Sequence, residues 1–225
     1  MKILAIDTAT EACSVSLGVG DRQFDRYVEL ERGHAEQLLP MVQELMAEAG
    51  VALASLDAIA FGRGPGGFTG VRLAASVAQG LGFGSGVGVV PISNLAAVAH
   101  RALAEHREAS RALVVNDARM REVYWCAFGR AAVPLPLGPE RVGPEESVLL
   151  PDAAGSWVAA GRGLRAWPAL AERCRAAGAA TLPDLLPRAA EILALARIEV
   201  AGGRILDPGD ALPVYVRDNV AEVPA

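Results

Sequence analysis

The order of strand and helix patterns in the first half of the chain restricts it to few folds. Three strand patterns come before any helix pattern: an apolar run at 2–7, an alternating run at 13–19 and a weaker run at 23–30. Helix and strand patterns then alternate, with helices expected at 35–49, 71–82 and 93–107 and strands at 56–61 and 87–91. This order predicts a ribonuclease-H-like fold, which is a mixed β-sheet with helices on both faces.

The opening pattern returns later in the chain. An apolar strand at 112–118 carries an aspartate and is followed by a second strand at 122–128, as at the start of the chain. This repeat, about 110 residues further on, predicts two similar lobes. We divide them at residues 1–108 and 109–225.

The second lobe is less regular, because prolines from Pro134 to Pro151 interrupt it. A strand is expected at 156–161 and helices at 164–177 and 187–202. The tail at 213–225 has no clear place in this pattern, and packing against the first lobe is one arrangement.

The composition favours a soluble globular protein, since 52% of the 225 residues are hydrophobic and 21% are charged. Runs of about 18 apolar residues are missing, and Asp7 comes too early for a signal peptide, so a cytoplasmic location is expected. Cys13, Cys126 and Cys174 lack metal-ligand spacing and are expected to be reduced. The net charge of −5 argues against a large surface for nucleic acid.

A glycine-rich segment at 62–70 joins the strand at 56–61 to the helix at 71–82. It is not a phosphate-binding Walker A loop, because no Gly-Lys-Ser or Gly-Lys-Thr follows. Nor does it follow the first strand of a dinucleotide-binding unit. Two interpretations remain: a tight turn or protein contact with Thr69 as helix cap, which we favour, or an anion site at Gly66, Gly67 and Thr69.

A carboxylate and two hydroxyls, Asp7, Thr8 and Thr10, follow the first strand. An actin-like nucleotide-binding protein would hold magnesium and phosphate at such a turn. The alternative, which we favour, is that these side chains satisfy the N–H groups of the turn. The second lobe offers only Asp117-Ala118-Arg119 to complete a nucleotide site.

Neither a metal site nor a catalytic group can be assigned from the sequence. His34 begins the helix at 35–49, but the position four residues on, where a second metal-binding histidine would lie, is Leu38. His100 and His106 have no partner in the sequence, and no Ser–His–Asp or Cys–His arrangement is visible.

The same helix carries more apolar surface than one sheet face requires. Its main stripe is Leu38, Val42, Leu45 and Ala49, and further apolar residues beside it are Leu39, Met41 and Met46. The next helix has a small-residue surface formed by Ala74, Ala75, Ala78 and Gly82. Ordinary core packing and a helix-mediated partner interface explain these surfaces equally well.

Four motifs resemble those of the TsaB (YeaZ) family. In chain order they are IDTAT at 6–10, GPGGFTGVR at 64–72, NDARM at 116–120 and PVYVRD at 213–218. The resemblance spans nearly the whole chain and departs at Gly67, where serine is usual. It implies an actin-like ATPase (ASKHA) fold with two ribonuclease-H-like lobes. It also implies a role in tRNA processing, the t6A modification, which places threonylcarbamoyl on N6 of adenosine 37 in tRNAs reading codons that start with A.

In this family the protein is a non-catalytic subunit that pairs with the paralogous transferase TsaD. The paralogue has two metal-binding histidines on the helix that here has Leu38. The resemblance further implies a homodimer on an overlapping surface, the ATPase TsaE as third component, and tRNA contact only through the complex. ATP with magnesium and a metal ion are implied for the partner subunits, with no cofactor bound by this chain alone.

The implied partner surface lies on the two helices at 35–49 and 71–82. Its expected residues are His34, Leu38, Leu39, Val42, Leu45, Met46, Arg72, Ala75 and Gln79. Two competing functions remain. One is an independent actin-like nucleotide hydrolase or kinase that uses Asp7, Thr8 and Thr10 with magnesium, and the other is a metalloprotease, against which the missing metal motif argues.

Overall fold

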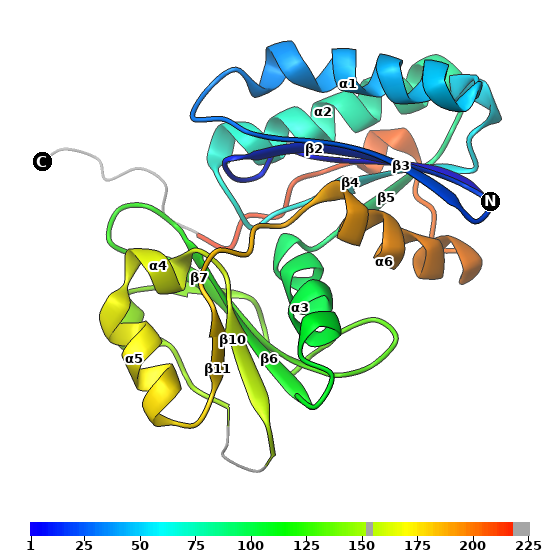
Figure 1. Cartoon of the computed structure of the whole chain (residues 1–225). Helices are drawn as coiled ribbons and strands as arrows, with labels where there is room; N and C mark the ends of the chain where they lie inside the picture. The colour runs from blue at the N-terminus through cyan, green and yellow to red at the C-terminus, as the bar shows by residue number, and fades with distance from the viewer. Residues whose placement is uncertain (152–154, 218–225) are drawn as a thin grey trace, which may run out of the picture.

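The computed structural model describes residues 1–151 and 155–217, which form two β-sheets and helices stacked in layers (Figure 1). The first sheet has the strand order β3-β2-β1-β4-β5. Its strands are β1 (Lys2–Asp7), β2 (Ala12–Val19), β3 (Arg22–Glu29), β4 (Ala58–Gly62) and β5 (Val89–Ile92). The first three strands are antiparallel neighbours, whereas β4 and β5 run parallel to β1. This is the predicted ribonuclease-H-like arrangement.

The second sheet repeats this topology around β6. Its order is β11-β10-β6-β7-β8, and β9 also pairs with β7. Its strands are β6 (Arg111–Asp117), β7 (Val123–Gly129), β8 (Leu135–Pro136), β9 (Arg141–Gly143), β10 (Trp157–Ala160) and β11 (Ala180–Leu182). As in the first sheet, the leading strand has an antiparallel hairpin partner on one side and parallel strands on the other. The prediction of two ribonuclease-H-like lobes is confirmed.

Helices cover both faces of each sheet. They are α1 (His34–Ala49), α2 (Phe68–Ser85), α3 (Asn94–Glu105), α4 (Gly163–Ala166), α5 (Pro168–Ala176) and α6 (Ala189–Ala201), with short 3₁₀ turns at Leu53–Ser55, Glu145–Ser147 and Pro208–Asp210. The helix predicted at 164–177 is divided in two, because Pro168 has no N–H for a continuous helix. Among the described helices, none is long and apolar enough to cross a membrane.

Each half of the chain contributes one helix that packs on the sheet of the other half. Helix α3, from the first half of the chain, packs on β6 and β10, whereas α6, from the second half, packs on β1, β2, β4 and β5. In Figure 1 both helices lie between the two sheets, with α1 and α2 on the outer face of the first sheet. The predicted division at residue 108 therefore separates the strands of the two sheets, but it separates α3 and α6 from the sheets on which they pack.

Alternation along β1 shows how the first sheet separates two cores. Leu4 and Ile6 face the core under α1 and α2, and Ile3 and Ala5 face the core under α6. A strand with both faces covered has to be apolar throughout, as the sequence at 2–7 is.

The C-terminal tail runs along α2 and then reaches the second lobe. Leu206 pairs with Val89 of the edge strand, and the Val214 N–H donates to the carbonyl oxygen of Arg63 at 2.8 Å. Further along, Arg217 donates to the Ala118 carbonyl oxygen at 3.3 Å. The predicted tail continues into 218–225, which lies outside the described residues.

The glycine-rich segment brings two turns of the backbone into close contact. The Gly67 N–H donates to the Ala9 carbonyl oxygen at 2.7 Å, and the Thr8 hydroxyl donates to the Gly70 carbonyl oxygen at 2.7 Å. A Cβ at Gly70 would overlap the Thr8 carbonyl oxygen. Helix α2 already begins at Phe68 with Gly67 as N-cap, so the expectation that Thr69 caps it is wrong.

The close contact at Gly70 and the open space around Gly80 predict opposite effects on stability when each of these glycines of α2 is replaced by alanine. Gly70→Ala forces a methyl group against backbone that cannot rotate away, so we expect it to lower the free energy of unfolding by roughly 1–3 kcal/mol. At Gly80 no residue in the described part of the chain lies within 4 Å of an added Cβ, so Gly80→Ala should raise the free energy of unfolding by up to about 1 kcal/mol. Urea denaturation of both variants measures the difference, and equal effects would contradict the packing argument.

Candidate functional site

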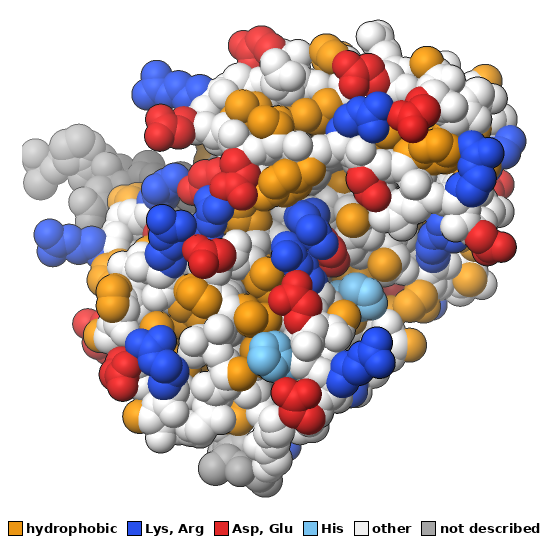
Figure 2. All heavy atoms as spheres, in the orientation of Figure 1, with side chains coloured by type: hydrophobic (Ala, Val, Ile, Leu, Met, Phe, Trp, Pro, Cys, Tyr) orange, Lys and Arg blue, Asp and Glu red, His pale blue; other side chains and the backbone are white. Residues whose placement is uncertain are grey.

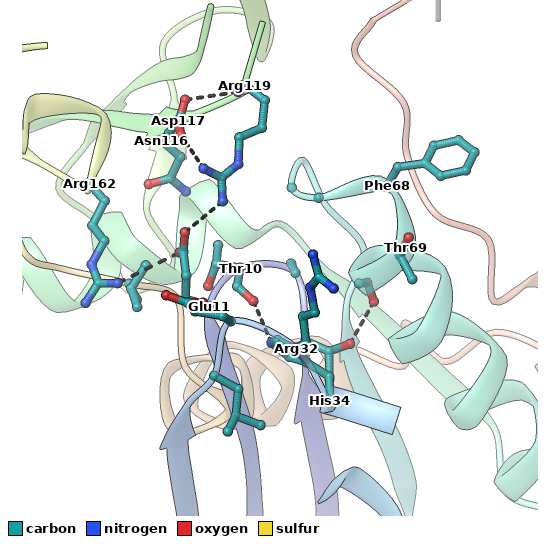
Figure 3. A pocket seen from close by; sticks show the side chains of 18 of the residues that line it. Thr10, Glu11, Arg32, His34, Phe68, Thr69, Asn116, Asp117, Arg119 and Arg162 are labelled. Carbon is teal, nitrogen blue, oxygen red and sulfur yellow. Dashed lines mark hydrogen bonds and ion pairs between the residues drawn. The ribbon is translucent and has the colours of Figure 1, made fainter. Parts of the chain in front are cut away.

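A cleft of about 930 Å³ lies between the two lobes (Figure 3). The first lobe contributes the turn after β1, the segment leading into α1 and the glycine-rich segment, at 8–11, 30–36 and 66–70. The second lobe contributes 116–119, at the end of β6 and directly after it, and residues around α4. A cleft of this size suits a small-molecule ligand.

Asp7, the acidic residue at the end of β1, does not reach the cleft. It is fully buried, and one of its oxygens accepts a hydrogen bond from the Asn94 amide at 2.6 Å. Desolvation raises the pKa of Asp7 to about 7, against the opposing effect of the Asn94 hydrogen bond. Gly62 packs against the same oxygen, because a Cβ there would overlap Asp7 Oδ1 and the Asn94 amide. The other oxygen, Oδ2, is buried without a hydrogen-bond partner among the described residues.

The hydroxyls of the same turn serve the fold. Thr8 is 1% exposed and donates to Gly70, and the Thr10 hydroxyl accepts from the Ala12 N–H at 3.2 Å. Of the glycine-segment candidates, Gly67 has its N–H bound to Ala9, whereas Thr69 is exposed. An actin-like fold implies magnesium and nucleotide here, but no free carboxylate faces the cleft from Asp7, so this part of the predicted nucleotide site does not fit.

The second-lobe side of the cleft carries two arginines, Arg119 and Arg162, of which the sequence indicates only Arg119 as a candidate. Arg119 lies 3.2 Å from Glu11 and 3.4 Å from Asp117, and Arg162 lies 3.9 Å from Glu11 and 2.5 Å from Glu29. The pairs with Glu11 and Glu29 join the two lobes, and those with Glu11 are seen in Figure 3. Only Asp117-Ala118-Arg119 was noted from sequence, because Glu11 and Arg162 become neighbours only through the fold.

Four of the predicted partner-interface residues are core residues. Leu38, Val42, Leu45 and Ala75 are at most 4% exposed and belong to the core under α1 and α2. The apolar stripe of α1 therefore faces the sheet. The small residues Ala74, Ala78 and Gly82 of α2 are buried as well, so they do not form the surface expected for another helix.

The other interface candidates lie at or near the surface. Leu39 is 44% exposed, and Met46 packs partly against the core. Arg72 is stacked on the Phe68 ring at 3.5 Å and donates to the Tyr215 hydroxyl at 2.6 Å, while Gln79 contacts the tail. The Nε2 atom of His34 lies 2.9 Å from the Thr10 carbonyl oxygen.

Among the described residues, the remaining titratable groups do not form a reactive cluster. Burial raises the pKa of the Cys13 and Cys174 thiols to about 11 and that of Cys126 to about 12, so these cysteines are poor nucleophiles. Within residues 1–151 and 155–217, no three His, Cys, Asp or Glu side chains are grouped to hold a metal ion. Figure 2 shows acidic and basic side chains interspersed over the face drawn.

The repeated sheet topology and the cleft between the lobes define a protein of the actin-like ATPase (ASKHA) superfamily. The chain is 40% identical to the tRNA threonylcarbamoyladenosine biosynthesis protein TsaB of Escherichia coli K12, over 98% of this chain and 96% of that protein. It is 35% identical to the Haemophilus influenzae protein of the same name, over 98% and 95%. The chain therefore belongs to the TsaB (YeaZ) family.

Two further comparisons agree with this membership. A solved structure of YeaZ from Pseudomonas aeruginosa superposes with a TM-score of 0.86 at 44% identity, covering 95% of this chain and 99% of that one. The family model described as TsaD, tRNA N6-adenosine threonylcarbamoyltransferase, matches residues 28–133. That partial match is the similarity expected between paralogues.

The buried carboxyl group of Asp7 predicts a pH-dependent stability. Its pKa rises from 3.8 in the unfolded chain to about 7 in the folded one, so the folded state holds the proton more tightly. The stabilisation is complete below pH 4 and is lost as the pH rises to about 7. At roughly 1.4 kcal/mol per pKa unit, the loss is up to roughly 4 kcal/mol.

Asp7→Asn keeps the acceptor for Asn94 but cannot ionise. We expect the free energy of unfolding of this variant, measured by denaturant titration at several pH values, to lack the pH-dependent contribution of the Asp7 carboxyl group. The difference between variant and wild type should then grow between pH 4 and pH 7. Parallel curves for the two proteins would show that Asp7 does not titrate in this range.

Proposed function

We propose that this chain acts in tRNA threonylcarbamoyladenosine biosynthesis as a non-catalytic subunit that binds and orders the TsaD paralogue. Its relatives over the full length carry the name of that pathway, which supports the process. The observation that carries the non-catalytic role is the state of Asp7, which is buried and bonded to Asn94 where an actin-like enzyme needs a free carboxylate. The proposed place of action is the cytoplasm.

The position of Leu38 supports the same role. On the paralogue's corresponding helix the resemblance implies a metal-binding histidine, but here Leu38 is fully buried in the core. Even a histidine at this position would be directed into the first lobe, away from solvent. A metal-dependent activity of this chain therefore has no support from α1, and we assign the metal ion and ATP with magnesium to the partner subunits.

The outer surface of α1 and α2 supports a helix-mediated partner contact. Ser76, Gly80 and Gly84 recur every four residues on α2, are exposed, and so share one face. No described residue lies within 4 Å of a Cβ added at Gly80 or Gly84. Helix axes approach most closely where side chains are small, so this face admits a partner helix. On α1, Leu39 adds exposed apolar surface on the same side of the sheet.

The proposal includes the other components that the resemblance implies. The homodimer would use the same α1 and α2 face, so it and the paralogue would compete. TsaE would join the assembled pair, and tRNA would bind through the complex. The net charge of −5 supports the last point, because an acidic chain gains little from contact with phosphates.

Gly80→Leu separates binding from folding. The variant should be at least as stable as wild type, because leucine favours a helix more than glycine does by up to about 1 kcal/mol. Gly80 is exposed, and no described residue lies within 4 Å of a Cβ added there. Its affinity for the paralogue, measured by calorimetry, should fall at least about tenfold because the side chain keeps the helices apart. Gly80→Ala is the matched control and should retain most of the affinity.

Leu39→Glu tests the α1 side of the same surface. A charge on this exposed residue should leave the fold intact but weaken the heterodimer, since an unpaired carboxylate would be desolvated there. Unchanged affinity in both Gly80→Leu and Leu39→Glu would remove the α1 and α2 face from the interface. Full tRNA modification by the other components without this chain would remove the subunit role itself.

A further inference from the structure

Two side chains lining the cleft hold buried polar atoms that no other group satisfies. Asn116 is 3% exposed, and in the described part of the chain neither its amide nitrogen nor its amide oxygen has a hydrogen-bond partner. The Nε of Arg162 is also buried, and no described residue forms a hydrogen bond with it. Leaving such a group unsatisfied costs about 1–3 kcal/mol, so buried polar atoms are almost always paired.

Both residues lie at the carboxyl edge of the second sheet. Strands β6 and β10 are parallel neighbours with Val114 opposite Ala160, and Asn116 and Arg162 each come two residues later. Gly161 keeps this edge tight, because a Cβ there would press on the Asn116 amide oxygen at 2.6 Å. In open α/β sheets, ligands bind outside the carboxyl ends of parallel strands.

A carboxylate side chain of the first lobe lies against this edge. The Glu11 carboxylate lies between two guanidinium groups, 3.2 Å from Arg119 and 3.9 Å from Arg162. In Figure 3 Asn116 lies between the two arginines, and all three are beside Glu11. The Glu11 side chain is 36% exposed, so water competes for its carboxylate and these ion pairs are weak.

We propose that Asn116, Arg119 and Arg162 form a subsite for the carboxylate or phosphate group of a small organic molecule, which displaces Glu11. The two guanidinium groups supply charge-assisted hydrogen bonds, and the Asn116 amide supplies a neighbouring donor and acceptor. Displacement of Glu11 costs little because its ion pairs are partly hydrated. The subsite needs neither Asp7 nor a metal ion, and it is independent of the proposed partner surface on α1 and α2.

Anion titration of the isolated full-length chain tests this subsite. Inorganic phosphate and acetate are titrated by calorimetry into wild type and Glu11→Gln, and the side-chain amide of Asn116 is followed by NMR. Removing the internal anion should tighten binding at least about fivefold and shift the Asn116 amide signal on saturation. Tighter binding of phosphate than of acetate assigns a phosphate-bearing ligand, and the reverse assigns a carboxylate.

Glu31→Gln is the matched control, because Glu31 also lines the cleft and its removal changes the net charge equally. It should leave phosphate affinity within about twofold of wild type, whereas an effect equal to that of Glu11→Gln would mean general charge and overturn the proposal. Within the Glu11→Gln background, Asn116→Ala should weaken binding at least about fivefold. Arg119→Gln, at an exposed side chain, gives the same test if Asn116→Ala fails to fold. Unchanged affinity in Glu11→Gln would also overturn the proposal.

Discussion

The Asn94 side chain connects the parts on which the rest of the structure depends. Its amide nitrogen donates to Asp7 at the end of β1, and its amide oxygen accepts from the Gly64 N–H at 2.7 Å. The backbone N–H of Asn94 donates to the Gly64 carbonyl oxygen at 3.0 Å. Because Asn94 begins α3, which packs on the second sheet, one buried amide fixes the first strand, the glycine turn and the other lobe relative to each other.

This arrangement makes the two walls of the cleft chemically different. On the first-lobe wall the hydroxyls of Thr8 and Thr10 are used within the protein, by Gly70 and Ala12. Asp7 is bonded to Asn94 through one oxygen, and its other oxygen is buried without a partner among the described residues but does not line the cleft. On the second-lobe wall Asn116 and Arg162 keep unsatisfied atoms. An actin-like cleft can thus lose the geometry for metal-bound nucleotide on one side and still recognise an anion on the other.

The sequence predicts most elements of the first lobe because each has a clear period and glycine or polar boundaries. It does not predict the exchange of α3 and α6, since an apolar stripe does not specify which sheet covers it. The same limit explains the interface errors: the stripe of Leu38, Val42 and Leu45 is equally typical of core and of interface. The strands β8, β9 and β11 are only two or three residues long, too short for a detectable alternation.

The cleft residues were missed for a different reason. Glu11, Asn116 and Arg162 are separated along the chain, and their chemistry arises only where the lobes meet. The tail also meets both lobes, since Tyr215 bonds Arg72 of α2 and Arg217 bonds the hairpin that carries Arg119. A partner that shifts α2 must therefore either strain this connection or move the hairpin. The tail thus links α2, which carries part of the proposed partner surface, to the hairpin that carries part of the proposed subsite.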